Sequence, residues 1–123
     1  MPHLTLEYTE NVEQNVNFQD LFSVLHDILA DVGGVNIDNC KSRAIRRDNY
    51  HIGAGEADKA FVHLELLLLE GRSSELKQEI GRRILNVLTQ YYASSQAERD
   101  LQITVQIGDI QRSGYFKVPT GTY

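Results

Sequence analysis

The chain has 123 residues, of which 41% are hydrophobic and 24% charged, and its formal net charge at pH 7 is -5. This length and composition fit one globular domain, which we expect to span residues 1–123. The acidic balance argues against general nucleic-acid binding, which needs a basic surface, but a local cluster of arginines can still bind an anionic ligand.

Cysteine content and the length of apolar runs indicate the cellular location of the protein. Cys40 is the sole cysteine, so no intrachain disulfide can form, and a cytoplasmic location is the simplest interpretation. The apolar run from Leu66 to Leu69 is far shorter than the roughly 20 residues that span a bilayer. The first residues also lack the basic and apolar regions of a signal peptide. We therefore expect no membrane partner.

The first half of the chain is predicted to form a strand, a helix and a second strand. Residues 3–8 alternate between apolar and polar side chains, which is typical of a strand with one buried face. Asn17 suits a helix N-cap, and apolar residues follow it at helical spacing as far as Gly33-Gly34, which ends the helix. Residues 39–47 are predicted to form the second strand, whose charged residues indicate a sheet edge or a site.

The second half repeats this order of elements. Residues 60–69 form a strand so continuously apolar that both of its faces are expected to be covered. Ser73 or Ser74 is the expected N-cap of the helix that follows. Residues 101–107 alternate as a last strand, and residues 113–119 are expected to contain a short extended piece.

Each half, roughly residues 1–57 and 58–118, is therefore predicted to be a βαβ unit. We predict an α+β fold (α/β by some schemes) in which the two units share a four-stranded mixed sheet with both helices on one face. The opposite face of such a sheet would be bare in an isolated chain. We therefore expect further subunits to cover it in an oligomer.

Four short segments stand out from this pattern: Met1-Pro2-His3, Lys41-Ser42-Arg43-Ala44, Ala60-Phe61-Val62-His63 and Gly71-Arg72-Ser73. Together with the two βαβ units, they resemble the tautomerase superfamily, and most strongly the 5-carboxymethyl-2-hydroxymuconate isomerase family within it. The resemblance covers roughly residues 1–118. It implies a tautomerase-like fold, a homotrimer, a small anionic carboxylate as substrate, and no metal or organic cofactor.

Pro2 is the residue on which the chemistry of this resemblance depends. Inside a chain the proline nitrogen is an amide, but removal of Met1 would turn it into a secondary amine that can act as a base. Burial and nearby cations lower the pKa of such an amine toward neutrality. We therefore expect Pro2 to be the catalytic base, and a protein that retains Met1 to be blocked and inactive.

The resemblance also implies which residues surround this base. In the similar 4-oxalocrotonate tautomerase a Gly-Arg-Ser turn supplies a catalytic arginine, which corresponds to Arg72, and a Gly-aromatic-Phe segment corresponds to Gly114-Tyr115-Phe116. Arg72 is expected to bind a carboxylate and to stabilise developing negative charge. Lys41 or Arg43 is expected to bind substrate, although only an arginine offers a planar two-pronged donor. Tyr115 and Phe116 are interpreted as an apolar wall over the site, as packing against a neighbouring subunit, or as both.

These residues predict an isomerase (a tautomerase) with Pro2 as general base. Its expected substrate is an unsaturated 2-hydroxy or 2-oxo carboxylate, and the resemblance implies 5-carboxymethyl-2-hydroxymuconate, an intermediate of 4-hydroxyphenylacetate degradation. The four histidines lack metal-ligand spacing, so no metal is expected. Two alternatives stay open: a related proline-dependent dehalogenase, hydratase or decarboxylase, and a non-catalytic ligand-binding or interaction module.

Overall fold

The computed structural model describes residues 1–119, and residues 120–123 of the expected domain lie outside the described part. The strands are β1 (His3–Thr9), β2 (Lys41–Arg47), β3 (Lys59–Leu69) and β4 (Asp100–Ile110). The helices are α1 (Phe18–Gly33), α2 (Ser74–Tyr91) and the short α3 (Ala93–Glu98), and 3-10 turns lie at η1 (Ile37–Asn39) and η2 (Arg112–Gly114).

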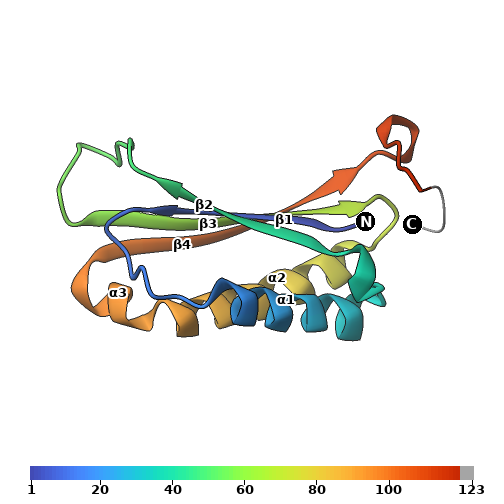
Figure 1. Cartoon of the computed structure of the whole chain (residues 1–123), viewed down its shortest axis with the longest axis horizontal. Coiled ribbons are helices and arrows are strands. Elements are labelled where there is room, and N and C mark those ends of the chain that lie inside the picture. Colours follow the sequence, from blue (N-terminus) through green and yellow to red (C-terminus); the bar gives the residue numbers. More distant parts are fainter. Residues whose placement is uncertain (120–123) are drawn as a thin grey trace.

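The four strands form one mixed sheet in the order β2-β1-β3-β4 (Figure 1). β1 pairs in parallel with β2, and β3 with β4, whereas the two units meet through the antiparallel pair β1–β3. α1 and α2 lie side by side on one face of this sheet (Figure 1). The predicted α+β fold of two βαβ units is therefore confirmed, with α3 as an addition.

Local capping fixes where the helices begin and end. The side chain of Asn17 accepts a hydrogen bond from the Asp20 amide at 3.1 Å, and α1 ends at Gly34, whose φ of 65° is a left-handed conformation that favours glycine. The Ser73 hydroxyl accepts from the Leu76 amide at 3.2 Å, so Ser73 is the cap of α2.

The core lies between the sheet and the helices. The helix-facing residues of β3 are buried to 1% exposure or less, whereas its opposite face is only half-buried. Alternation sends Leu66 and Leu68 to the helices, and it sends His63 and Glu65 to the other face. The prediction that both faces of this strand are covered therefore holds for one face in the isolated chain.

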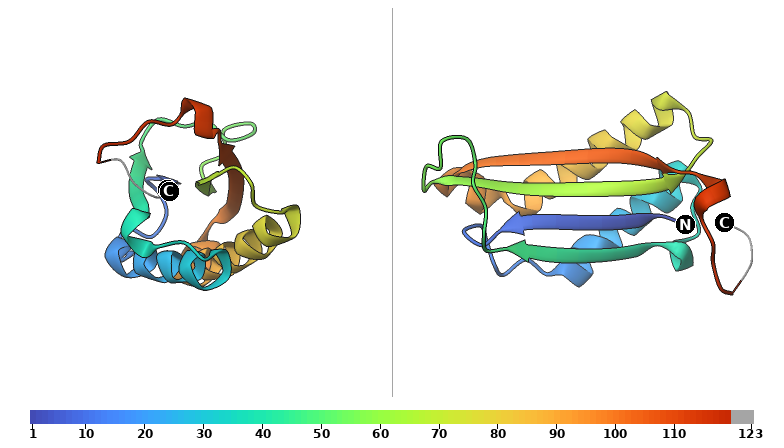
Figure 2. Two further views of the ribbon diagram at one scale, coloured as in Figure 1. Left: turned by 90° about the vertical axis from the view of Figure 1, so that its right-hand side faces the viewer. Right: turned by 90° about the horizontal axis from the view of Figure 1, so that it is seen from above.

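The start of β1 and the segment after β4 meet at one end of the sheet (Figure 2). That segment opens with η2, whose first amide, at Arg112, donates to the Glu70 carboxylate at 2.7 Å. The backbone of Tyr115, directly after η2, is extended and lies within residues 113–119, where a short extended piece was predicted. None of the described helices has both the length and the apolar character that a membrane span requires.

Candidate active site

Pro2 lies directly before β1, at the end of the sheet where the two termini of the described chain meet. The residue is buried, and its carbonyl accepts a hydrogen bond from the Lys41 amide at 3.1 Å. This bond continues the parallel β1–β2 ladder by one step, so the sheet holds the backbone of Pro2 in a fixed direction.

The amino terminus beside Pro2 is surrounded by cations. Met1 is 3% exposed, and burial followed by the positive charge of Arg72 lowers the pKa of its amino group. Cys40 raises that pKa, and the charges of Lys41 and Lys117 each lower it by a smaller amount than Cys40 raises it. These surroundings of the terminal nitrogen, with Arg72, Lys41 and Lys117 acting on it, are called the recess below, and their burial and positive charge favour the neutral, basic form of an amine.

Arg72 reaches this recess because of the turn between β3 and α2. Gly71 has a φ of 115°, a conformation that side chains rarely adopt, and it reverses the chain between the end of β3 and the N-cap of α2. The Nη1 atom of Arg72 donates to the Leu69 carbonyl at 3.2 Å, while its buried Nε has no hydrogen-bond partner among residues 1–119. A buried guanidinium N–H without a partner favours an incoming anion at this position.

Arg43 makes a different set of contacts on the sheet face that carries no helices. Its Nη2 lies 3.0 Å from Nδ1 of His3, and its Nη1 donates to the Thr5 hydroxyl at 3.4 Å. His3 in turn reaches the segment after β4, because its Nε2 lies 2.8 Å from the hydroxyl oxygen of Tyr115. Burial and then the charge of Arg43 lower the pKa of His3.

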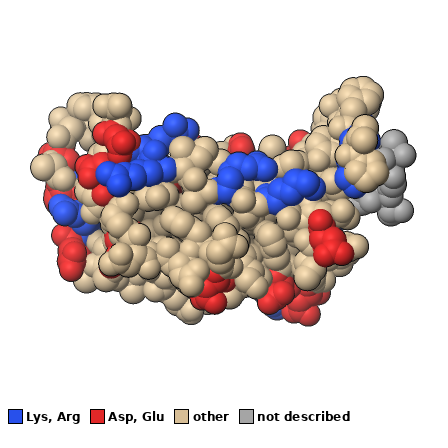
Figure 3. Space-filling model, viewed as in Figure 1, with Lys and Arg blue, Asp and Glu red and all other residues tan. Residues whose placement is uncertain are grey.

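The two remaining cations of β2 lie at its other end. Arg46 pairs with Asp48 at 2.8 Å, and Arg47 pairs with Glu7 at 2.8 Å. Figure 3 shows Lys and Arg side chains in a row at the level of the sheet. Because the two arginines at the far end already face carboxylates, only the end of the row near Pro2 offers cations to a ligand.

Comparison with known proteins shows which family the chain belongs to. Residues 2–119 match the family described as 5-carboxymethyl-2-hydroxymuconate isomerase. This chain belongs to that family. It is 26% identical over 117 residues to the 5-carboxymethyl-2-hydroxymuconate Delta-isomerase of Escherichia coli, across 95% of this chain and 93% of that protein.

Solved structures agree with this assignment to the isomerase family. A crystal structure of a 5-carboxymethyl-2-hydroxymuconate isomerase from Deinococcus radiodurans R1 is 35% identical, with a TM-score of 0.84, and the match covers 94% of this chain and 87% of that one. A fused 4-OT symmetric trimer shares the fold at 16% identity and a TM-score of 0.72, covering 95% of this chain and 92% of that one. The resemblance to the tautomerase superfamily is thereby confirmed, and the chain is an enzyme of the isomerase class.

The structure of this isomerase brings most of the predicted site residues to one end of the sheet. The charges of Arg72 and Lys41 both act on the terminal amino group, and Arg43 and Tyr115 meet at His3. Phe116 differs, because it is 88% exposed and forms no wall over the recess within the described subunit.

Two residues of this end were given no role by the sequence analysis. His3 was named there only within Met1-Pro2-His3, and its contact with Tyr115 depends on the return of a segment 112 positions away. Lys117 carried no motif, although its position three residues after Gly114 places it within reach of the first residues once the sheet has formed. Only the spacing within Gly114-Tyr115-Phe116-Lys117 could have suggested it.

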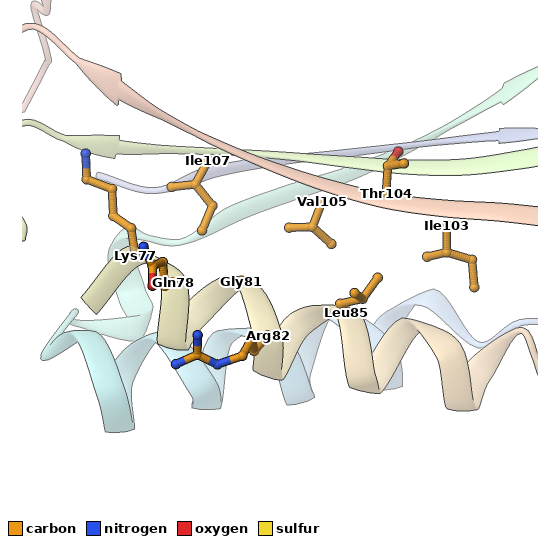
Figure 4. Close-up of a pocket in the computed structure, with 9 residues that line it drawn as sticks. All are labelled: Lys77, Gln78, Gly81, Arg82, Leu85, Ile103, Thr104, Val105 and Ile107. Atoms are coloured by element: carbon orange, nitrogen blue, oxygen red, sulfur yellow. The ribbon is translucent and has the colours of Figure 1, made fainter. Parts of the chain in front are cut away.

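The family's chemistry is not expected in the grooves elsewhere on the surface. A groove of about 600 Å³ lies between α2 and β4, with Leu85, Val105 and Ile107 among its lining residues (Figure 4). Its charged residues are Lys77 and Arg82, and both already pair with carboxylates, Lys77 with Asp109 at 2.9 Å and Arg82 with Glu79 at 3.2 Å. Among the residues that the structure describes, no group of three or more His, Cys, Asp or Glu side chains could hold a metal ion.

Proposed function

We propose that this isomerase moves a proton along 5-carboxymethyl-2-hydroxymuconate or a similar unsaturated 2-hydroxy carboxylate, with the nitrogen of Pro2 as the general base. The observation that carries the proposal is the buried amino terminus, on which the charges of Arg72, Lys41 and Lys117 all act. Each of these effects favours the neutral form of an amine, which is the form that can accept a proton.

The charge of the recess matches the charge of this substrate class. By its name, 5-carboxymethyl-2-hydroxymuconate carries the two carboxylates of a muconate and a third on its carboxymethyl group. Three cations, Arg72, Lys41 and Lys117, act on the terminal amine, so each carboxylate can have a positive partner. Arg72 has the planar guanidinium that also suits an oxygen on which negative charge develops.

Removal of Met1 is a requirement of this proposal. In the chain as translated, the Pro2 nitrogen is an amide and Met1 fills the recess with 3% exposure. Cleavage of the Met1–Pro2 bond exposes a secondary amine and empties the space that the methionine occupied. The new amine then takes the surroundings of the old one, so we expect its pKa to be lowered by the same burial and the same cations.

The reaction itself is an internal transfer. Pro2 takes the proton of the 2-hydroxyl group or of an allylic carbon, electron density moves along the conjugated chain, and the proton returns to another carbon. The formula of the substrate is unchanged, while a C–H bond forms and the double bonds are transposed. The guanidinium of Arg72 stabilises the negative charge that the intermediate carries between the two proton transfers.

We also propose that the enzyme works as a homo-oligomer, and as a homotrimer in particular. The sheet face opposite the helices is only half-buried in one subunit, and Phe116 and Val118, in the segment after β4, are 88% and 94% exposed. A related fold is a symmetric trimer in the fused 4-OT protein. Subunits that pack around the helix-free faces would cover both features.

The proposal is tested with protein whose intact mass shows that Met1 is absent. Ultraviolet spectroscopy follows the loss of the conjugated substrate, and Pro2→Ala is expected to lower kcat/KM by about a hundredfold or more, because a primary amine in a displaced position replaces the base. A chain that retains Met1 is expected to be inactive. Equal rates for processed wild type, Pro2→Ala and the Met1-retaining chain would refute the role of Pro2.

A further inference from the structure

Met1 is held inside the fold, unlike the first residue of most chains. Its exposed fraction is 3%, and Pro2 after it is buried as well. Chain ends usually fray unless contacts tie them down. The first peptide bond of this chain therefore lies within a buried stretch that leads directly into β1, and Met1 does not project from the surface.

The sheet holds this end of the chain from two sides. The Pro2 carbonyl accepts a hydrogen bond from the Lys41 amide at 3.1 Å, which joins the first residues to β2. β1 is an inner strand, because β2 lies on one side of it and β3 on the other. His3 pairs with Lys41 in β2 and with Leu67 in β3. Drawing residues 1–3 out of the sheet therefore breaks pairing with both neighbouring strands.

The end of β3 is buried beside this part of the chain. β1 and β3 are antiparallel, with His3 opposite Leu67, so the chain before His3 runs alongside the chain after Leu67. That part of β3 consists of Leu68 and Leu69, which are 1% and 2% exposed. Met1 is thus enclosed at an end of the sheet where the neighbouring strand is also closed to solvent.

Removal of Met1 is a hydrolysis that another enzyme must carry out. Water adds to the Met1 carbonyl carbon, the bond to the Pro2 nitrogen breaks, methionine leaves with the new carboxylate, and the Pro2 nitrogen takes up a proton. A peptidase that removes one terminal residue encloses it in a pocket of its own, because such pockets bury most of the surface of their ligand. Met1 cannot enter a second pocket while it is buried in this fold.

We propose that Met1 is removed only before β1 joins the sheet, and that a chain which folds with Met1 in place is closed to processing. This rests on the proposed function, in which the Pro2 amine must be released, and it adds when that release takes place. The partner is a methionine-specific aminopeptidase that acts on the unfolded start of the chain. A folded chain that retains Met1 stays blocked until the start of β1 opens.

Intact mass during treatment with a purified methionine aminopeptidase tests the proposal. The substrates are the folded Met1-retaining protein and, as a reference, a peptide of residues 1–8, which is a single strand without a sheet to join. Cleavage of a folded protein follows the population of its open form when opening and closing are fast. We expect the folded protein to lose Met1 at least about tenfold more slowly than the peptide, and any smaller difference would overturn the proposal.

A lengthened chain shows whether the position of Met1 is the cause of this protection. A short Gly-Ser segment inserted between Met1 and Pro2 carries the methionine into solvent and leaves the rest of the sequence unchanged. The folded, lengthened protein should lose its methionine about as fast as the peptide. If it were cleaved as slowly as the chain of native length, burial of Met1 would not be what protects it, and the proposal would fail.

A matched pair of core variants locates the opening that processing requires. Leu4→Ala loosens the start of β1, whereas Leu21→Ala removes an equally buried side chain in α1, since both leucines are 0% exposed. We expect the folded Leu4→Ala protein to lose Met1 about tenfold faster than the folded Leu21→Ala protein. Equal rates in the two variants would show that the start of β1 does not control access.

Delayed addition of the peptidase establishes the order of events in wild-type sequence. Met1-retaining protein is unfolded in urea, diluted to refold, and given the peptidase for a fixed short time after increasing delays. We expect the fraction that loses Met1 to fall with the delay, at the rate at which circular dichroism shows the sheet to form. A fraction that does not change with the delay would contradict the proposal.

The activity of each form is measured separately, so this proposal and the proposed function can fail independently. If the folded chain resists the peptidase, but processed and Met1-retaining proteins isomerise the substrate equally fast, the order of processing stands and the role of Pro2 fails. If the folded chain is processed as fast as the peptide and only the processed form is active, the role of Pro2 stands and the order of processing fails.

Discussion

At the residue scale, the surroundings of the amino terminus set the pH at which the base is available. A neutral amine is needed to accept a proton, so kcat/KM should rise with pH as the amine loses its proton. Arg72 lowers the pKa of the terminal amino group, and its removal must therefore raise that pKa. The acid limb of the pH profile should then move to higher pH.

Arg72→Met tests this expectation in processed enzyme. We expect the acid limb of kcat/KM to shift upward in pH, and the maximal kcat/KM to fall by about a hundredfold or more, since a donor to the developing charge is lost. Arg82→Met is the matched control, because Arg82 is exposed on α2 and pairs with Glu79 at 3.2 Å. A pH profile that keeps its acid limb in Arg72→Met would show that this guanidinium does not act on the base.

His3 and His26 make the stability of the subunit sensitive to acid. Burial lowers the pKa of both, and the charge of Arg43 adds to the effect at His3. Because the folded pKa lies below the unfolded one, the unfolded chain binds more protons, and stability is lost as the pH falls below the unfolded value of about 6.5. Urea unfolding should give a smaller free energy of unfolding at pH 5 than at pH 7, and His3→Phe should reduce that difference.

The residues of the site differ in how far the sequence could predict them. Pro2 and Arg72 belong to local motifs, at the chain start and in a Gly-Arg-Ser turn, so the resemblance to the tautomerase superfamily could suggest their roles. His3 and Lys117 have no motif, and their roles depend on which strand lies beside which. Such contacts between distant segments follow from the strand order and register, which single-sequence periodicity does not supply.

At the scale of the elements, capping explains why the helix boundaries could be predicted. Asn17 and Ser73 both carry side chains that accept from amides of the first helical turn, and both precede apolar residues at helical spacing. The short helix α3 could not be foreseen, because its residues, Ala93–Glu98, show no apolar period and its N-cap makes no side-chain hydrogen bond. Its one buried residue, Ser95, accepts from the Glu13 amide at 2.7 Å, a long-range contact.

The Ser73 hydroxyl caps α2 directly after Arg72, so loss of this hydroxyl should lower the stability of the protein. Ser73→Ala removes the hydroxyl that accepts from Leu76, and we expect the free energy of unfolding to fall by about 1 kcal/mol. Ser74→Ala, one residue further on, leaves that bond intact and should change the free energy of unfolding by less than about 0.5 kcal/mol. Urea denaturation measures both. If the two variants were equally stable, the cap would contribute nothing to α2.

At the scale of the whole molecule, the arrangement of layers leaves one face of the sheet without helices. The sequence predicted this bare face from the topology, yet it overestimated how apolar the face is. Alternation along β3 turns Leu64, Leu66 and Leu68 toward the helices, so His63 and Glu65 stand on the open side. Contacts between subunits on this face would therefore combine hydrogen bonds with apolar packing, and the two most exposed large apolar side chains, Phe116 and Val118, lie in the segment after β4.

Phe116 is the side chain through which assembly can best be tested. It is 88% exposed in one subunit, and covering a phenylalanine contributes roughly 1.5–3 kcal/mol for each copy in a symmetric assembly. If the proposed trimer forms, Phe116→Ser should shift it toward monomer in sedimentation equilibrium at micromolar concentration, while Asn86→Ser, on the exposed side of α2, should not. The variant subunit should keep its fold, since Phe116 is not part of the core. Two results would show that this segment does not join the subunits: a wild-type protein that sediments as a monomer, and a Phe116→Ser trimer that is as stable as the wild-type trimer. The open sheet face would then have to be covered in another way.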